Sequence, residues 1–243
     1  MGLAEGLVII PAYNEEKNIG AVLEDIRRFH YDIDIIVIND ASKDNTEQVV
    51  VEKGEKIINH FYNLGYGGAL QTGFKYAADK GYEYVIQFDG DGQHDPADIQ
   101  SIIDELKTGC YDIVIGSRFL GESSFQISSA KKLAIALFCS IIRISTGVKI
   151  TDPTSGLQGL TLRSYKYYSR MGNFPDDFPD ADTLIHMLKR NCRVKEVPAH
   201  MKNRLHGQSM HSGLKSLYYT FKMLISISVV LLRSKIKNQN LKG

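Results

Sequence analysis

Charge of one sign, paired cysteines and long apolar runs are all scarce in this chain of 243 residues. The formal net charge is +1, so nothing indicates bulk binding of nucleic acid. The three cysteines, Cys110, Cys139 and Cys192, form no C-x-x-C pair, which indicates reduced thiols in a cytoplasmic protein. No apolar run reaches the ~18–20 residues of a membrane-spanning helix, and the N-terminus lacks the pattern of a signal peptide.

Short apolar runs instead alternate with amphipathic segments along the chain. The expected strands cover residues 7–10, 34–40, 57–60, 84–86, 112–118, 157–162 and, at a sheet edge, 193–198. The expected helices cover residues 19–29, 63–78, 96–106, 133–144, 183–189 and a turn or two around 49–51. Asn14 is a candidate cap for the first helix, and Gly109 for the end of the helix at 96–106. The alternation predicts an α/β domain with a mostly parallel central sheet and flanking helices.

The stretch 87–96, Gln-Phe-Asp-Gly-Asp-Gly-Gln-His-Asp-Pro, follows one of the buried strands. In an extended segment, Asp89 and Asp91 at i, i+2 lie on one face, and Gly90 and Gly92 permit a tight turn. Two carboxylates aimed at one point favour a cation between them, and Mg²⁺ or Mn²⁺ would also bind phosphate oxygens. This predicts a metal–diphosphate site, with a surface acidic turn as the competing interpretation.

Other strands of the predicted sheet also end in polar residues. These ends are 11–15, 39–40, 89–93 and 117–118. Ligands of open α/β sheets bind beyond the carboxyl ends of the strands, so we expect these segments to converge on one site.

The glycine-rich segment at 63–69 lies between a strand and a helix, an order that is also found in dinucleotide-binding proteins. Leu70 stands where the third glycine of that fingerprint is needed, which argues against a nicotinamide or flavin site. Close approach of the backbone to a phosphate or base stays open.

In this order the motifs resemble family 2 glycosyltransferases of the GT-A fold, above all the polyprenyl-phosphate sugar synthases of the dolichyl-phosphate mannose synthase type. The matching segments are 10–15 (Ile-Pro-Ala-Tyr-Asn-Glu), 39–44, 63–65, 89–94 (Asp-Gly-Asp-Gly-Gln-His), 116–118, 152–156 and 204–209 (Arg-Leu-His-Gly-Gln-Ser). They extend to about residue 211, so the resemblance implies a GT-A domain over 1–211 and an additional segment at 212–243.

The resemblance implies a role for each matching position. The residues expected to bind substrate are Pro11, Tyr13, Glu15, Asp40, Gly65, Asp89, Lys131, Lys132, Ser155, Arg204 and Ser209. Asp89, Asp91 and Gln93 are expected to hold the metal. Arg118 is expected to face a phosphate, and Asp180 or Asp182 falls where related enzymes carry an acidic catalytic residue.

The implied reaction is an inverting transfer of a hexose from a UDP- or GDP-linked sugar, assisted by Mg²⁺ or Mn²⁺. A lipid phosphate acceptor is already ionised near neutral pH, because its second pKa is ~6, and it needs cations rather than a base. A sugar hydroxyl acceptor needs a carboxylate base, so a saccharide acceptor stays open, as does a catalytically silent sugar-nucleotide binding module. A nucleotidyltransferase is disfavoured, because no N-terminal glycine-rich loop carries a lysine for a triphosphate.

The last segment, 214–232, is apolar and aromatic, and Arg233, Lys235 and Lys237 follow it. One interpretation is an amphipathic helix in the membrane interface, with the basic tail on anionic headgroups. The other is a helix that packs on the domain or on a second copy. A polyprenyl phosphate acceptor would favour peripheral association with the inner face of the cell membrane, directly or through a membrane-protein partner.

Overall fold

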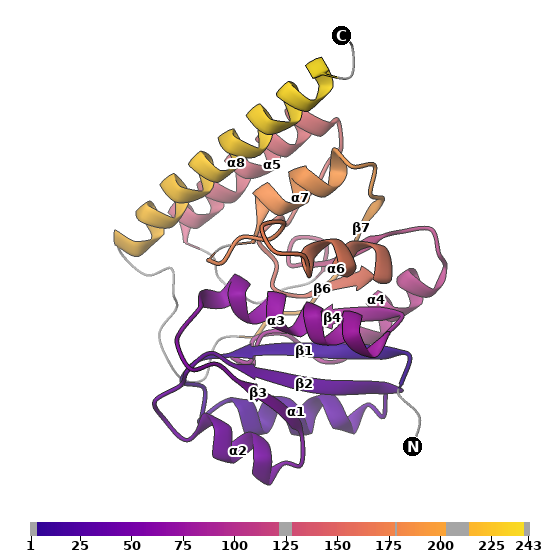
Figure 1. The fold of residues 1–243 in the computed structure, drawn as a ribbon, viewed down its shortest axis with the longest axis vertical. Coiled ribbons are helices and arrows are strands. Elements are labelled where there is room, and N and C mark those ends of the chain that lie inside the picture. The colour runs from indigo at the N-terminus through magenta and orange to yellow at the C-terminus, as the bar shows by residue number, and fades with distance from the viewer. Residues whose placement is uncertain (1–3, 122–127, 178, 203–213, 241–243) are drawn as a thin grey trace.

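The computed structural model describes residues 4–121, 128–177, 179–202 and 214–240. Within these ranges seven strands form one sheet in the order β3-β2-β1-β4-β6-β5-β7 (Figure 1). The strands are β1 (Gly6–Ala12), β2 (Ile33–Asn39), β3 (Lys56–Asn59), β4 (Tyr84–Gln87), β5 (Ile113–Ser117), β6 (Gln158–Thr161) and β7 (Val194–Pro198). The predicted α/β class is confirmed, and β7 with Pro198 lies at the sheet edge as expected.

The strand directions bring most of the carboxyl ends to one edge of the sheet. β1 pairs in parallel with β2 and β4, and β2 with β3. β6 runs antiparallel to both β4 and β5, so β5 has the direction of β4, and β7 pairs with β5 in parallel. Six of these seven strands therefore point the same way, with β6 as the exception.

Helices cover both faces of the sheet. They are α1 (Ile19–Arg28), α2 (Thr46–Glu52), α3 (Gly65–Lys80), α4 (Asp98–Lys107), α5 (Ser129–Thr146), α6 (Leu162–Tyr168), α7 (Ala181–Leu188) and α8 (Leu214–Asn240). Alternate side chains of β1 enter opposite cores, because successive residues of a strand point to opposite faces. Val8 and Ile10 pack with α1, α2 and α4, whereas Leu7 and Ile9 lie in the larger core of α3 and α5–α8.

The C-terminal helix α8 runs along α5 and packs on α7 (Figure 1). Tyr219, Met223 and Ile227, four residues apart, are buried in the larger core. Tyr218 and Phe221 point outward from the same helix and are exposed. The helix is thus part of the folded body on one face, and a boundary at residue 211 stays a prediction.

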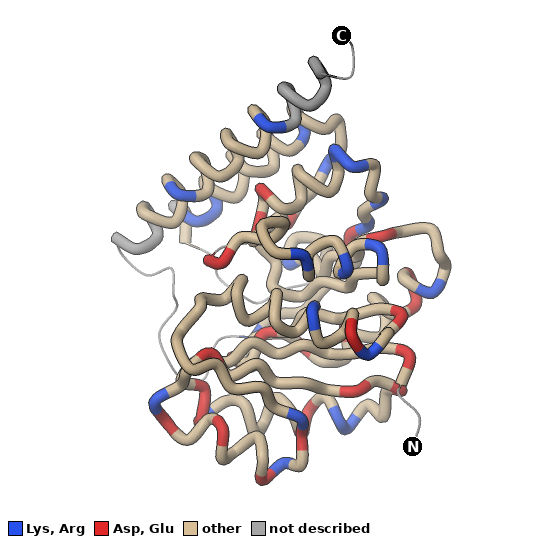
Figure 2. The backbone as a smooth tube through the Cα atoms, viewed as in Figure 1, with Lys and Arg blue, Asp and Glu red and all other residues tan. Residues whose placement is uncertain are grey.

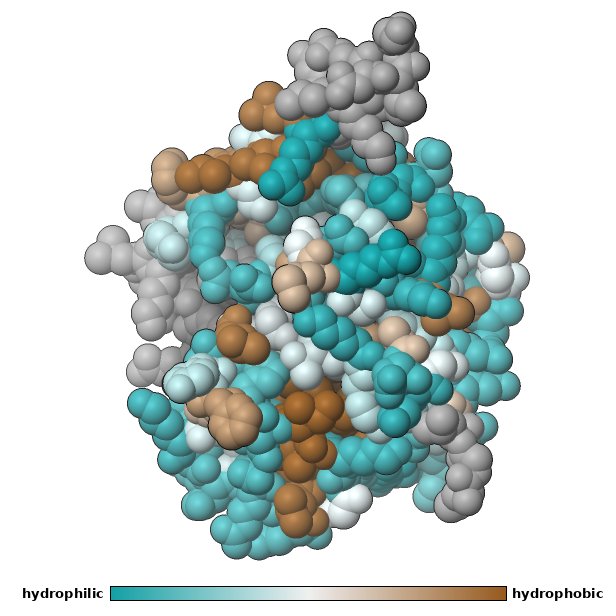
Figure 3. All heavy atoms as spheres, in the orientation of Figure 1, coloured by the Kyte–Doolittle hydropathy of each residue, from teal (hydrophilic) through white to brown (hydrophobic). Residues whose placement is uncertain are grey.

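Charge and hydropathy are distributed unevenly over the surface. Acidic and basic residues alternate around α1 and α2, whereas Lys and Arg gather on α6 and on the backbone that follows α7 (Figure 2). Apolar side chains gather along the edge formed by α5 and α8 (Figure 3). No helix among the described residues is long and apolar enough to cross a membrane.

At the ends of the helices, one predicted cap is wrong, one helix was not predicted, and one predicted helix end is confirmed. Asn14 does not cap α1: it has a left-handed φ of 56°, and its Oδ1 accepts from the Lys43 backbone N–H at 2.8 Å, which ties two loops together. The helix α6 was missed because it follows β6 without a glycine or proline between them. Gly109 ends α4 as expected, with φ of 68° and its N–H donating to the Leu106 carbonyl.

Candidate active site

A cavity of about 580 Å³ opens at the carboxyl ends of β1, β2 and β4. Pro11, Asp40 and Asp89 follow or end these strands and line it together, as the parallel pairing requires. The expected site residues that line it are Pro11, Tyr13, Glu15, Asp40, Gly65, Asp89, Asp91, Lys131, Ser155 and Asp180. Gln93, Arg118, Lys132 and Asp182 do not line it, and Arg204 and Ser209 lie outside the described residues.

Asp89 is held from two sides. The Tyr66 hydroxyl donates to its Oδ1 at 2.8 Å, and His94 Nε2 lies 3.5 Å from its Oδ2. Burial alone would raise the pKa of Asp89, but the hydrogen bonds and charge of His94 and the hydrogen bond from Tyr66 outweigh it, so the pKa lies below its usual range. Gly156 leaves room for this carboxylate, because a Cβ there would lie 1.9 Å from Asp89 Oδ2. The ionised form of Asp89 is therefore favoured.

Asp91 shares the cavity with Asp89, whereas Gln93 turns away. Asp91 Oδ1 accepts from the Gln93 backbone N–H at 3.0 Å, and the Gln93 side chain reaches the Lys202 carbonyl at 3.4 Å. The described residues contain no group of three or more His, Cys, Asp or Glu side chains that could hold a metal by themselves. Two carboxylates facing one cavity nevertheless fit Mg²⁺ or Mn²⁺ whose other ligands are diphosphate oxygens and water. The donor set is thus compatible with a metal that arrives with the substrate.

Asp40 lines the cavity, but its carboxylate is engaged by the loop before α3. Its Oδ1 accepts from the Leu64 N–H at 2.8 Å, and its Oδ2 from the Gly65 N–H at 2.9 Å. Gly65 has a left-handed φ of 85°, which glycine adopts without strain. Asp40 therefore fixes the glycine-rich turn beneath the cavity.

Tyr13 and Glu15 form the wall contributed by the loop after β1. Tyr13 is 46% exposed, so its ring is accessible to a ligand. The Glu15 backbone N–H donates to Thr46 Oγ1 at 2.9 Å, which ties this loop to the start of α2. The wall is thus positioned by the neighbouring strand–helix connection.

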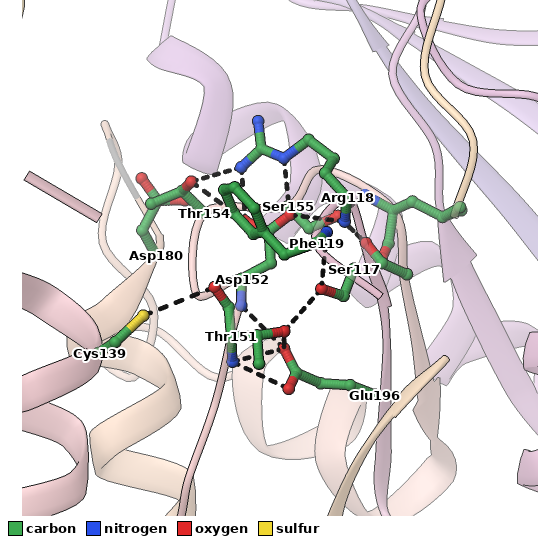
Figure 4. A network of polar contacts seen from close by, with 12 residues as sticks. Ser117, Arg118, Phe119, Cys139, Thr151, Asp152, Thr154, Ser155, Asp180 and Glu196 are labelled. Atoms are coloured by element: carbon green, nitrogen blue, oxygen red, sulfur yellow. Dashed lines mark hydrogen bonds and ion pairs between the residues drawn. The ribbon is translucent and has the colours of Figure 1, made fainter. Parts of the chain in front are cut away.

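Arg118 forms a buried ion pair behind the cavity (Figure 4). Its Nε and one terminal nitrogen lie 2.6 and 2.5 Å from the two Asp152 carboxylate oxygens, and that terminal nitrogen also donates to Thr154 Oγ1. Burial opposes the charged guanidinium, but the Asp152 contacts outweigh it and raise the pKa of Arg118. Ser155 Oγ donates to the Gly116 carbonyl at 2.6 Å. Arg118 and Ser155 thus hold the 152–156 loop, and a direct contact of Arg118 with phosphate stays a prediction.

Lys131 and Lys132 separate at the start of α5. Lys131 lines the cavity, while Lys132 is exposed outside it, because neighbouring residues on a helix point about 100° apart. Burial, and then the charge of Arg118, lowers the pKa of Lys131. Lys131 is therefore the cation that α5 places at the cavity, and its contact with a ligand stays a prediction.

Asp180 and Asp182 likewise lie in different surroundings. Asp180 lines the cavity and accepts a hydrogen bond from the Tyr219 hydroxyl of α8. Asp182 is buried away from it, where it accepts from the Ser226 hydroxyl and from the Thr183 N–H. Burial raises the pKa of Asp180 to about 7, against the hydrogen bond from Tyr219, and burial likewise raises the pKa of Asp182.

Among the side chains of this cavity that were not expected from the sequence are three large aromatic ones: Tyr66, Phe138 and Tyr219. Tyr66 lies inside the glycine-rich segment, whose glycines indicated a backbone contact with a ligand and gave no role to this side chain. Phe138 and Tyr219 belong to apolar helical segments whose pattern indicates packing. The helical periodicity of these segments does not indicate that part of each helix, α5 and α8, reaches the cavity.

Comparison with known proteins gives the family. Residues 7–168 match the model of glycosyl transferase family 2. The chain is 32% identical over 209 residues to a UDP-N-acetylglucosamine–dolichyl-phosphate N-acetylglucosaminyltransferase of Methanococcus voltae, covering 79% of this chain and 83% of that one. It is 27% identical over 219 residues to an undecaprenyl-phosphate mannosyltransferase of Micrococcus luteus, covering 85% and 87%.

The fold is shared with a solved enzyme. Glucosyl-3-phosphoglycerate synthase from Mycobacterium tuberculosis, in complex with Mn²⁺, UDP and glucosyl-3-phosphoglycerate, aligns with a TM-score of 0.66 at 17% identity, covering 95% of this chain and 80% of that one. At this identity the likeness concerns the fold, and it agrees with the GT-A architecture expected from the motifs. The chain belongs to glycosyltransferase family 2, and its relatives include proteins named as dolichyl- and undecaprenyl-phosphate sugar transferases.

Proposed function

We propose that the protein is an inverting glycosyltransferase that moves a hexose from a UDP- or GDP-linked sugar to a polyprenyl phosphate at the cytoplasmic face of the membrane. The observation that carries the proposal is one cavity that carboxylates and a cation line together. Asp89 and Asp91 are the carboxylates proposed for the donor, and Lys131 is the cation proposed for the acceptor. The names of the relatives, which are dolichyl- and undecaprenyl-phosphate sugar transferases, support the acceptor class.

On the donor side, Asp89 and Asp91 would hold Mg²⁺ or Mn²⁺ against the diphosphate. When bound, such an ion offsets the negative charge that develops on the departing nucleoside diphosphate. Tyr66 and His94 keep Asp89 oriented and ionised, so the carboxylate is ready before the substrate arrives. The exposed ring of Tyr13 offers a surface for the base.

On the acceptor side, an oxygen of the lipid phosphate would attack the anomeric carbon from the face opposite the leaving group. The new C–O bond forms as the bond to the nucleoside diphosphate breaks, which inverts the configuration. The phosphate is ionised near neutral pH and needs orientation rather than deprotonation. Lys131, a cation without an ion-pair partner among the described residues, would supply that orientation.

Asp180 favours a second candidate, transfer to a saccharide hydroxyl. A general base works best when its pKa lies near the operating pH, and the pKa of Asp180 is about 7. A carboxylate in this position would deprotonate a hydroxyl acceptor. The two candidates differ in whether Asp180 is essential.

The outer faces of α5 and α8 support peripheral contact with a membrane. The exposed apolar residues of these faces are Leu133, Leu137 and Ile144 of α5 and Tyr218, Phe221, Ile225, Val229 and Leu232 of α8 (Figure 3). The inner faces of the same helices line the cavity through Lys131 and Tyr219. A bilayer against the outer faces would bring a lipid-linked phosphate close to the cavity, and Arg233 would favour anionic lipid.

The test is a transfer assay with a panel of UDP- and GDP-sugars, with Mn²⁺ or EDTA, and two acceptors: polyprenyl phosphate in anionic vesicles and soluble oligosaccharides. We expect metal-dependent transfer to polyprenyl phosphate. Phe221→Ser should raise the KM for the vesicle-borne acceptor and leave that for the nucleotide sugar unchanged. Transfer to oligosaccharides alone would contradict the lipid acceptor, and nucleotide-sugar binding without any transfer would favour the silent module.

A further inference from the structure

A second cavity, of about 400 Å³, lies on the outer side of α6 and α7 and shares no residue with the first. Its lining residues are Leu162, Arg163, Lys166, Tyr167, Arg170, Met187, Arg190 and Cys192. Four of the eight are cations in a chain whose net charge is +1. Figure 2 shows Lys and Arg positions clustered on the backbone of α6. Family membership and the proposed reaction leave this cavity without a role.

Among the described residues, three of the four cations have no acidic partner. Arg163 lies 3.5 Å from the Asp112 carboxylate. Among the residues that the structure describes, no carboxylate lies within 4.0 Å of the charged groups of Lys166, Arg170 or Arg190. Like charges brought together on one rim repel each other, and an anion between them would relieve that repulsion.

An aromatic ring fixes the position of Arg190. The guanidinium carbon lies 4.2 Å from the centroid of the Tyr167 ring. Tyr167 is itself held by His186, whose ring stacks on it at 5.5 Å and whose Nε2 lies 2.8 Å from the Tyr167 hydroxyl. A guanidinium held by a ring keeps its N–H fork free for bidentate contact with an oxyanion.

The floor of the cavity is apolar. Met187 and Cys192 are buried beneath the cationic rim, and Leu162 borders it. The volume falls in the range of ~300–1,000 Å³ that is typical of small-molecule sites. We propose that this cavity binds a phosphate-bearing ligand, with its phosphate held by Lys166, Arg170 and Arg190 and its remainder on the floor.

The binding site would be connected to the catalytic cavity through α7. Asp180, which immediately precedes this helix, lines the catalytic cavity, and Arg190 follows its C-terminal end. The eight residues of α7 span about 12 Å. A phosphate bound here would therefore contact the helix that positions the acceptor-side carboxylate, without competing for the donor site.

The competing explanation is that these cations complement the partial negative charge at the C-terminal ends of α6 and α7. That explanation predicts a stabilising role and no ligand. Lys189→Glu is a matched control, because Lys189 is exposed at the same helix end but does not line the cavity.

The test is isothermal titration with pyrophosphate and inorganic phosphate in EDTA, and sedimentation with phosphatidylglycerol vesicles. The wild type is compared with Arg170→Glu/Arg190→Glu, Lys189→Glu and Lys131→Ala. We expect saturable binding that the double variant weakens at least about tenfold, since two charge-assisted contacts are lost, with the other variants within about twofold.

Each outcome of this experiment supports or overturns the proposal. Binding of the soluble anions identifies a free phosphate compound as the ligand, whereas vesicle binding alone, lost in the double variant, identifies a lipid headgroup. No binding by the wild type, or equal losses in Lys189→Glu and the double variant, overturns the proposal. Loss in Lys131→Ala alone would assign the binding to the catalytic cavity and overturn the proposal, because Lys131 is the cation that lines that cavity.

Discussion

Two pairs of aspartates, each spaced i, i+2, differ in how many of their members line the catalytic cavity. Asp89 and Asp91 follow β4, and both line the cavity. Asp180 and Asp182 lie at the start of α7, and only Asp180 lines the cavity, because Asp180 precedes the helix with a non-helical backbone (φ −115°, ψ −117°) whereas Asp182 lies in its first turn. The same spacing therefore has different consequences after a strand and at the start of a helix.

The two pairs also differ in what supports them. Asp89 is held by Tyr66 and His94, and the pKa of Asp89 lies below its usual range. Asp180 is held by Tyr219 of α8, and burial raises the pKa of Asp180 to about 7. The first pair suits a cation, whereas the second suits proton transfer or close packing.

The largest expected effect comes from breaking the first pair. Asp91→Asn keeps an oxygen that can accept the hydrogen bond from the Gln93 N–H, so the loop should persist. The lost negative charge should weaken metal-dependent nucleotide binding and lower kcat/KM at least about 100-fold. Steady-state kinetics and titration of UDP with Mn²⁺ measure both effects.

Asp104→Asn is the matched control, because Asp104 is exposed on α4, away from the cavity. It should retain wild-type kinetics, and both variants should melt within a few degrees of the wild type. Full activity of Asp91→Asn in EDTA would show that this pair does not hold a metal.

Breaking the support of the second pair should have an intermediate effect. Tyr219→Phe removes a hydrogen bond that lowers the pKa of Asp180, so that pKa should rise. If ionised Asp180 contributes to turnover, the acidic limb of the kcat profile moves to higher pH, and a rise of about one pKa unit lowers kcat at pH 7 about fivefold.

Tyr218→Phe is the control on the same helix, because Tyr218 is exposed and does not line the cavity. Its pH profile should match that of the wild type. An unchanged profile for Tyr219→Phe would leave Asp180 without a protonation-dependent role and would favour the phosphate acceptor.

The contrast between the pairs also explains what could be predicted from the sequence. Apolar runs predicted every strand, and parallel pairing then brings Pro11, Asp40 and Asp89 to one edge. No local pattern in the sequence distinguishes Asp180 from Asp182, because the distinction depends on the exact residue at which α7 begins. The contact from Tyr219 spans 39 residues and depends on how α8 packs, which periodicity leaves open.

The ion pair of Arg118 could not be predicted either, because it too joins residues that are far apart in the sequence. Its partner, Asp152, lies 34 residues away in a loop, and neither residue belongs to a periodic segment at that point. The motif indicated that Arg118 mattered but suggested a phosphate as its partner. Long-range polar contacts of this kind depend on the tertiary fold rather than on spacing.

The smallest expected effect is on stability, and it tests the environment of Asp180 without a substrate. In the folded protein the pKa of Asp180 is about 7, against an ordinary value of 3.8. Between these values the folded state holds a proton that the unfolded state has released, so stability falls as the pH rises from about 4 to about 7. Asp180→Asn removes this loss and should melt higher than the wild type at pH 8 but not at pH 4. Because Asp180 is partly exposed to the cavity, water screens the effect, and we expect on the order of 1 kcal/mol, roughly 2–4 °C.

Asp104→Asn, on an exposed helix face, is the control and should follow the wild type at both pH values. If the melting temperature of Asp180→Asn differs from that of the wild type by the same amount at pH 4 and at pH 8, the result would contradict a raised pKa at this position.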